Sequence, residues 1–545
     1  MRRALADPSL MLCRVARRRQ IQGIGQSRRR VRRLRQWATI ALGVGLLSIS
    51  LQTRAEDSAP FSAHRHEIQG LVRQVWPLGV SECAGERTDL LVLSTDGGPP
   101  SQQKWMTWMP CGSALDPEDP RIVKRRLSDA TVLVDVALVP GRQGPQLLTI
   151  SAAGLEIESL GSTGEPIREL AIPGGLPLPP RPWEIGRLPI VDDWNDDTRP
   201  TALIPALSGA WLLDLETGEA RKIEMPIYAS YITYSPFLPA TVWKWMIQEV
   251  TWPAISRVDD NGDGRPDLFA LSRWGIWIYH IGPDGLPSEP SRRIDVIPFD
   301  ADVERRHQAT VNNYFARDLN GDGRADLLLN TIFGGLMNGR SSTRIQINDG
   351  TGASLANTPD AVRETEGGLS GFSFVDLDGD GVEEMIETTM DFGIVQMMRI
   401  LVTRKAKTQV RVLVLDPDSL DGTRTIFKDE FSFSLNFGDS SMSGLIPSIG
   451  DWNGDGVQDM FVARGEDEIS FRIGSSESGE PVFGKAKGRQ AVGLDSGESR
   501  IADLNGDGLD DIIAFTDNDP NQPLIVLENA GRLPGTPSSM RTTSK

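Results

Sequence analysis

The sequence predicts an all-β chain folded as a β-propeller of seven or eight four-stranded blades, and three observations support this. An acidic nine-residue stretch occurs five times, beginning at Asp259, Asp318, Asp376, Asp451 and Asp503. Each copy is followed by a short apolar run typical of a buried strand, such as LFAL or IIAF. The ninth positions of consecutive copies are 59, 58, 75 and 52 residues apart, which suits one four-stranded blade per copy.

The first copy, DDNGDGRPD from Asp259 to Asp267, concentrates negative charge in a short turn. Close carboxylates repel one another unless a cation lies among their oxygens. Positions 1, 3, 5 and 9 supply side-chain oxygens and position 7 a backbone carbonyl, a set that calcium prefers over magnesium and that soft metals avoid. We therefore expect five calcium ions, with these ligands: Asp259, Asn261, Asp263, Arg265 and Asp267; Asp318, Asn320, Asp322, Arg324 and Asp326; Asp376, Asp378, Asp380, Val382 and Glu384; Asp451, Asn453, Asp455, Val457 and Asp459; Asp503, Asn505, Asp507, Leu509 and Asp511.

The acidic loops could also be ordinary hairpin turns or EF-hand loops. Asn-Gly and Asp-Gly also form ordinary hairpin turns, but five copies that keep carboxylates at positions 1, 5 and 9 favour a metal site. An EF-hand opens with the same spacing, yet it needs a Glu at position 12 and a helix on either side. Position 12 is a glutamate only at Glu387, so we predict that each loop joins two strands.

Weaker copies of the repeat precede the clear ones. The stretch DWNDDTRPTALI keeps Asp193, Asn195 and Asp197 but lacks both glycines and has Thr201 at position 9. Two fainter copies begin at Val134 and Glu86, which gives eight units in all. The predicted propeller therefore covers residues 56–532, with degenerate repeats at 64–251 and clear calcium repeats at 252–531.

Four further segments carry structural expectations. The strand-like HEIQGLV, His66 to Val72, is expected to complete the last blade, because ring closure often pairs strands from opposite ends of a chain. The stretches TVWKWMIQEV from Thr241 and FGIVQMMRILVTRK from Phe392 fit either a short inserted helix or a long strand. Residues 533–545, rich in Ser, Thr and Pro, are predicted to be a disordered tail.

The N-terminus has the composition of an export signal. Residues 1–55 carry 13 of the 57 basic residues and a single acid, Asp7, and lead into the apolar segment WATIALGVGLLSISL. We predict a signal peptide with a long basic n-region, cleaved after Ala55. The apolar segment is shorter than the roughly 20 residues of a membrane span, although an uncleaved anchor is the alternative. The mature form is then expected to have no membrane span and to be periplasmic, extracellular or on the cell surface.

The predicted mature chain is strongly acidic. It holds 44 basic and 73 acidic residues, and 44 minus 73 gives a formal charge of −29. Nucleic-acid binding requires a basic surface, so no nucleic-acid partner is expected. Of the three cysteines, Cys13 lies in the leader, and Cys83 and Cys111 either form one disulfide or remain two buried thiols.

The acidic motif with its following strand resembles the FG-GAP and VCBS repeats of integrin α-subunit propellers and of many exported bacterial proteins. The resemblance spans roughly Glu86 to Gly531 and is strong after Val258. It implies a seven- or eight-bladed propeller with calcium held in the hairpin loops between the first two strands of a blade. Recognisable FG and GAP flanks are missing, so the VCBS label fits better and the integrin partner surface cannot be transferred.

The sequence predicts a binding function rather than catalysis. We find no nucleophile elbow, no phosphate loop and no cysteine with a base partner. His64 and His66 could face one metal from a strand, but no third ligand is evident. The main hypothesis is a non-catalytic scaffold for binding or adhesion to a protein or polysaccharide. The alternative is a carbohydrate-active enzyme, a hydrolase or lyase, on the same scaffold.

Overall fold

A computed structural model describes the chain from residue 59 to residue 536. The exceptions are residues 82, 84–86, 98–101, 140, 152, 162–167, 174–184, 235–244, 273–274, 296–309, 334–339, 355–358, 367, 392–393, 404, 417, 420, 437–440, 446–447, 464–467, 478–479, 495 and 517–518. The chain divides into two units, Met1–Ser58 and Ala59–Lys545. The predicted signal peptide and its cleavage site therefore lie outside the described residues.

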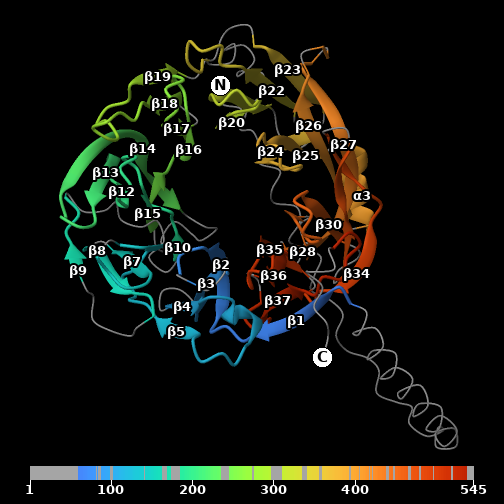
Figure 1. Cartoon of the computed structure of the whole chain (residues 1–545), viewed down its shortest axis with the longest axis horizontal. Coiled ribbons are helices and arrows are strands. Elements are labelled where there is room, and N and C mark those ends of the chain that lie inside the picture. The colour runs from blue at the N-terminus through green and yellow to red at the C-terminus, as the bar shows by residue number, and fades with distance from the viewer. Residues whose placement is uncertain are drawn as a thin grey trace, which may run out of the picture. The chain divides into compact units, whose positions relative to one another are not determined.

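The described residues form eight antiparallel sheets that follow one another around a ring, as Figure 1 shows for this unit. The prediction of a β-propeller is confirmed, and of the two blade numbers the structure has eight. Blades 1 to 4 are β2 (Leu71–Leu78), β3 (Asp89–Asp96), β4 (Gln103–Met109) and β5 (Val123–Arg126); β6 (Leu133–Ala137), β7 (Gln146–Ser151), β8 (Gly154–Ser159) and β9 (Arg168–Leu170); β11 (Val191–Asp192), β12 (Thr201–Pro205), β13 (Ser208–Asp214) and β14 (Ala220–Tyr234); β16 (Ala254–Val258), β17 (Asp267–Ser272), β18 (Gly275–Tyr279) and β19 (Arg292–Asp295).

Blades 5 to 8 contain the remaining acidic repeats. Their strands are β20 (Thr310–Arg317), β21 (Asp326–Phe333), β22 (Arg340–Gln346) and β23 (Ala361–Glu366); β24 (Gly368–Val375), β25 (Glu384–Asp391), β26 (Lys405–Leu415) and β27 (Thr423–Asn436); β29 (Ile449–Gly450), β30 (Asp459–Ala463), β31 (Glu468–Arg472) and β34 (Lys487–Ala491); β35 (Ser496–Ala502), β36 (Asp511–Phe515), β37 (Leu524–Asn529) and β1 (Phe61–His66). The second strand of a blade pairs with a neighbour at each edge. All residues of β17 and β36 are buried, because both faces of these strands pack against neighbouring blades.

The ring closes through β1, which pairs antiparallel with β37 in the register Phe61↔Asn529 to His66↔Leu524. The closing strand is thus N-terminal, as expected, but its predicted bounds, His66 to Val72, are wrong. β1 ends at His66, and Gly70 turns the chain before β2. Gly70 takes the left-handed φ of 75°, and a Cβ there would lie 2.4 Å from the carbonyl oxygen of Thr95. Leu71 and Val72 consequently begin the first strand of blade 1.

Other elements extend the regular blades. A parallel strand, β10 (Gly186–Arg187), lies beside β6, and β15 (Trp245–Thr251) pairs with β14. The hairpin β32 (Gly474–Glu477) and β33 (Glu480–Phe483) extends blade 7, and β28 (Ser441–Leu445) joins β27 to β35. The described part of the Thr241 stretch is therefore strand, whereas the Phe392 stretch contains helix α3 (Ile394–Thr403). A 3-10 turn, η2 (Ser113–Leu115), follows β4.

The apolar core lies between neighbouring blades. Phe269 and Ile276 of blade 4 pack in one cluster with Tyr314 and Leu327 of blade 5, and all four are buried. Equivalent clusters join the other blades, so that each sheet buries its faces on its neighbours. Leu533 belongs to the cluster of blades 7 and 8 and Thr536 is also buried, so the first residues of the predicted tail are packed.

Cys83 and Cys111 are joined by a disulfide, with their Cα atoms 5.5 Å apart. Of the two states left open by the sequence, the structure has the bridge. It connects the loop before β3 to the residue pair that follows β4, both within blade 1. Among the described residues, no helix is long and apolar enough to cross a membrane.

Candidate metal sites

Each acidic loop connects the first and second strands of one blade, as the sequence predicts. The loops follow β16, β20, β24, β29 and β35, and their ninth residues begin β17, β21, β25, β30 and β36. The five candidate sites therefore occupy the same place in blades 4, 5, 6, 7 and 8. Glu387, the only glutamate at position 12, lies within β25 and is bound by Arg363 and Arg411, which argues against an EF-hand.

The loop backbone winds around the carboxylate at position 1. In the first loop, Asp259 accepts hydrogen bonds from the backbone N–H groups of Gly262 and Gly264, both at 2.7 Å. These glycines have φ values of 78° and 81°, in the left-handed region that favours glycine. The Asp263 carboxylate accepts the N–H of Arg265 at 2.9 Å. The loop therefore gathers the side-chain oxygens of positions 1, 3 and 5 on one turn.

The same winding recurs in the other four loops. The hydrogen bonds from the glycines at positions 4 and 6 to the aspartate at position 1 are 2.7 to 3.0 Å long throughout. Those from the N–H of position 7 to the carboxylate of position 5 are 2.8 to 3.0 Å long. One loop conformation is thus built five times, which the repeated glycines and aspartates explain.

The carboxylate at position 9 anchors each loop to its sheet. One oxygen of Asp326 accepts the N–H of Leu319 at 3.0 Å, and the other accepts the N–H of Asn348 at 2.8 Å. Asp267, Asp459 and Asp511 are bound in the same way by position 2 and by a residue at or just past the end of the third strand. The side chains of all three are almost fully buried.

Burial makes the negative charge at position 9 unfavourable. It raises the pKa of Asp326 to about 6, of Glu384 and Asp459 to about 7 and of Asp511 to about 8. The carboxylates at the other loop positions raise these pKa values further by repulsion. A bound cation removes both causes, because it compensates the buried charge and the repulsion together.

The donor set fits a hard cation best in the third loop. Carboxylate oxygens of Asp376, Asp378 and Glu384 lie within 4.8 Å of one another. Asp378 occupies position 3, where the other four loops have asparagine, so this loop offers the largest negative charge. All ligands are oxygens from carboxylates, amides and backbone carbonyls, the chemistry that calcium requires.

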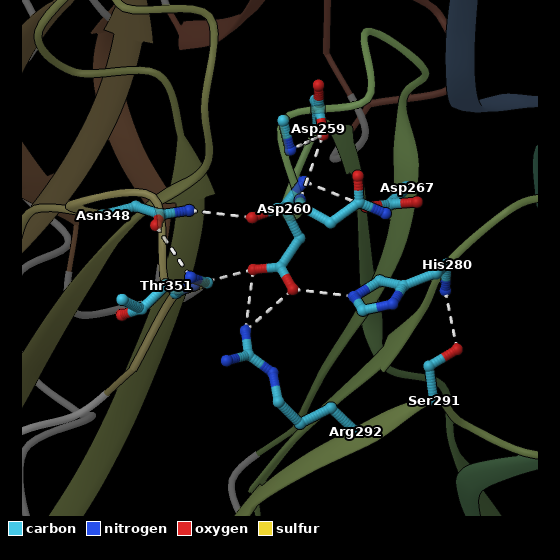
Figure 2. A network of polar contacts seen from close by, with 12 residues as sticks. Asp259, Asp260, Asp267, His280, Ser291, Arg292, Asn348 and Thr351 are labelled. Carbon is cyan, nitrogen blue, oxygen red and sulfur yellow. Dashed lines mark hydrogen bonds and ion pairs between the residues drawn. The ribbon is translucent and has the colours of Figure 1, made fainter.

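A second cluster, Asp260, Asp267 and His280, also has ligand atoms within 4.8 Å of one another. Asp260 in this cluster is already engaged, as Figure 2 shows. It is 1% exposed and accepts hydrogen bonds from His280 Nε2 at 2.9 Å, from Arg292 at 2.7 and 2.8 Å, and from the N–H of Ala353 at 2.7 Å. These bonds tie blade 4 to blade 5 and already pair the Asp260 carboxylate with a cation, Arg292.

Asp260 was missed by sequence reasoning. It stands at position 2, where the other loops have Leu319, Leu377, Trp452 and Leu504, all buried and apolar. That exception was the available signal. Its partners His280 and Arg292 lie 20 and 32 residues away, so their convergence could not be anticipated.

Blades 1 to 3 keep the place of the acidic loop but not its complete set of ligands. In blade 3, the degenerate loop lies between β11 and β12, and Asp193 accepts the N–H groups of Asp197 at 2.9 Å and Thr198 at 2.7 Å. Asp196 and Thr198, at positions 4 and 6, take left-handed φ values of 56° and 66° without being glycines. Position 9 is Thr201, which is buried and offers no carboxylate.

The third metal-like cluster, Cys83, Asp89 and Cys111, is the disulfide of blade 1 with one buried aspartate. The two sulfurs are bonded to each other and are not metal ligands in that state. His64 and His66 also do not converge on one ion. His64 pairs with Glu528 at 3.0 Å, whereas His66 is buried and its Nε2 contacts the carbonyl of Ala114 at 2.7 Å.

Comparison with known proteins identifies the repeats. The FG-GAP-like repeat family matches residues 259–329 and 318–386. No curated protein matches the chain. A crystal structure of the V. cholerae biofilm matrix protein Bap1 is similar, with 13% identity, a TM-score of 0.39 and coverage of 87% of this chain and 89% of that one. BBS1N in complex with ARL6DN has 10% identity, a TM-score of 0.25 and coverage of 74% and 93%. Residues 259–386 are therefore FG-GAP-like repeats, carried on an eight-bladed β-propeller.

Proposed function

We propose that this protein is an exported, calcium-stabilised propeller that acts as a non-catalytic scaffold for binding or adhesion, with a protein or a polysaccharide as its partner. Five ions would be held by the loops of blades 4 to 8. Calcium is abundant outside cells, so sites of modest affinity would be filled there. Five ions would also bring the formal charge of residues 56–545 from −29 to −19.

The observation that carries this proposal is the buried carboxylate at position 9. It begins a core strand in all five loops, and burial raises its pKa in each of them. A fold that repeats so unfavourable a group five times, each beside two or three further carboxylates or amides, is best explained by a cation that binds there.

The non-catalytic part of the proposal follows from how the candidate groups are used. The clustered carboxylates are committed to the loops, and Asp260 and His280 are held in a buried network with Arg292. FG-GAP propellers are generally scaffolds. The enzyme alternative would require a pair of carboxylates outside the loops that acts on a glycosidic bond.

Two measurements test the proposal. Elemental analysis of the protein equilibrated with millimolar calcium is expected to return about five ions per chain, and a result of none would refute the calcium sites. Capture of proteins and polysaccharides from the native envelope, with calcium and again with chelator, is expected to yield a partner that depends on calcium. Turnover of a polysaccharide that disappears on replacing one carboxylate outside the loops would instead establish the enzyme.

A further inference from the structure

Consecutive acidic loops touch one another along one arc of the propeller. The backbone N–H at position 8 of one loop donates to a carbonyl at position 1 or 2 of the preceding loop. These hydrogen bonds are Ala325 to Asp259 at 2.7 Å, Gln458 to Leu377 at 2.8 Å and Asp510 to Asp451 at 3.0 Å. A conformational change in one of these loops would therefore affect the backbone of its neighbour.

One pair of loops has an additional link through Asn348, shown in Figure 2. The backbone N–H of Asn348 donates to Asp326 at 2.8 Å, at position 9 of the loop in blade 5. Its side-chain amide donates to the carbonyl of Asp260 at 3.0 Å, in the loop of blade 4. The amide oxygen accepts N–H groups of Gly350 and Gly352, which fixes the orientation of the side chain. Asn348 is 2% exposed.

The same device recurs in blades 7 and 8. The backbone N–H of Asn529 donates to Asp511 at 2.7 Å, and its side-chain amide donates to the carbonyl of Trp452 at 2.9 Å. Its amide oxygen accepts the N–H of Gly531, and the side chain is 1% exposed. Trp452 and Asp260 both stand at position 2 of their loops, so the two asparagines make equivalent connections.

The corresponding positions of blades 4 and 7 lack this connection. Ile281 and Gly474 donate their backbone N–H groups to Asp267 and Asp459, as Asn348 and Asn529 do to their own aspartates. Neither has a side-chain amide that could reach the preceding blade. Within the described residues, the acidic loops of blades 6 and 7 are thus joined by the backbone hydrogen bond from Gln458 to Leu377 without a side-chain amide. The chain therefore contains its own comparison.

We propose that Asn348 and Asn529 couple the calcium sites of blades 4 and 5 and of blades 7 and 8, so that filling one site of a pair raises the affinity of the other. The inference rests on the proposed calcium binding. An ion in the loop of blade 5 fixes Asp326, which holds Asn348, and Asn348 holds the residue next to the ligand Asp259. The second ion then binds a loop that is already ordered, which makes binding cooperative and reciprocal.

A double-mutant cycle tests the coupling between blades 4 and 5. Asp263→Ala disables the loop of blade 4, and Asn348→Ser removes the amide while retaining the backbone N–H. Bound calcium is counted across a series of buffered free-calcium concentrations for the wild type, both single variants and the double variant. We expect Asp263→Ala to remove one ion and to shift the half-saturation of one other ion upward by about fivefold or more. In the Asn348→Ser background that shift should be clearly smaller, because only the backbone hydrogen bond between the two loops remains.

The outcomes separate this inference from the proposed function. If no calcium binds to the wild type, the proposed function fails. If calcium binds but Asp263→Ala shifts the remaining ions equally with and without Asn348, the coupling is refuted. Asp380→Ala in blade 6 is the matched control, since its effect on the other ions should not depend on Asn348. Asn529→Ser with Asp455→Ala repeats the cycle in blades 7 and 8 should the first set fail to fold.

Discussion

Blades 4 to 8 and blades 1 to 3 use different groups to hold the loop between their first two strands. In every blade the loop between the first two strands must be held against the sheet. Blades 4 to 8 begin the second strand with a buried carboxylate in an acidic loop, whereas blades 1, 2 and 3 begin it with Asp89, Gln146 and Thr201. The difference shows that holding this loop in place is a feature of the whole fold, to which a cation in blades 4 to 8 would be one contribution.

Blade 1 offers the most direct comparison with the acidic loops. Asp89 accepts the N–H groups of Ser81 at 2.9 Å and Cys111 at 2.8 Å. The arrangement resembles that of position 9 in the acidic loops, except that the donor before Asp89 lies at position 1 instead of position 2. Cys83 lies six residues before Asp89, at position 3, where the acidic loops place a metal ligand. Its disulfide to Cys111 therefore joins covalently the two segments that the position 9 carboxylate connects by hydrogen bonds in the acidic loops.

The largest expected effect is that of calcium removal. A ligand that binds only the folded chain at a hundred times its Kd adds about 2.7 kcal/mol per site, so five sites would dominate the free energy of unfolding. Chelator should lower the melting temperature markedly, and calcium should restore it. Limited proteolysis in chelator, with the cut sites assigned by mass spectrometry, should begin in the loops between residues 259 and 511. Cuts spread evenly over blades 1 to 8 would contradict the expectation that calcium stabilises blades 4 to 8 more than blades 1 to 3.

The pH dependence of the calcium-free protein should be the next largest effect. The folded pKa of Asp511 is about 8, above its ordinary value of 3.8, so the folded chain binds the proton more tightly than the unfolded chain. The resulting stabilisation is complete below pH 4 and is lost as the pH rises toward 8. Asp326, Glu384 and Asp459 act in the same direction, with folded pKa values of about 6 to 7.

Melting temperatures measured in chelator between pH 5 and pH 8 test this sign. They should fall as the pH rises, while the increase produced by calcium should grow, because protons and calcium compete for the same carboxylates. Asp511→Asn, which cannot ionise, should show a smaller fall. A calcium-free melting temperature that rises over this range would show that the position 9 carboxylates are charged and satisfied without an ion.

Loss of the disulfide should have a smaller effect that does not depend on calcium. Replacing both cysteines, Cys83→Ser with Cys111→Ser, should lower the free energy of unfolding on the order of 3 kcal/mol, because the bridge restrains the unfolded chain. Denaturant unfolding in calcium and in chelator should give the same loss. A loss of unfolding free energy in only one of the two conditions would mean that the disulfide of blade 1 and the acidic loops do not stabilise the fold independently.

The sequence predicted those parts of the fold and of the candidate sites that depend on a short repeated motif. Spacing located the five loops at the start of buried strands, because position 9 is followed immediately by apolar residues such as LFAL after Asp267. It could not reveal Asn348 or Asn529, since an isolated asparagine before a glycine predicts only a turn. Their second role requires the preceding blade, 88 and 77 residues away, to lie alongside.

The smallest expected effect is a gain of calcium binding in blade 3. Its loop already has Asp193, Asn195 and Asp197 at positions 1, 3 and 5, and Asp196 and Thr198 take the left-handed conformations of the missing glycines. Combining Thr201→Asp with Asp196→Gly and Thr198→Gly would supply the buried carboxylate and relieve the strained backbone.

A sixth ion should then appear in elemental analysis, with a calcium-dependent stabilisation of about 1 kcal/mol if free calcium exceeds Kd roughly fivefold. The site should be weaker than the natural five because Asn195 accepts the N–H of Leu286 at 3.2 Å and would have to release it. Thr201→Asn in the same background is the matched control, since it has the shape of aspartate without the charge. If the asparagine variant bound the sixth ion equally well, the buried carboxylate would not be what separates blades 4 to 8 from blade 3.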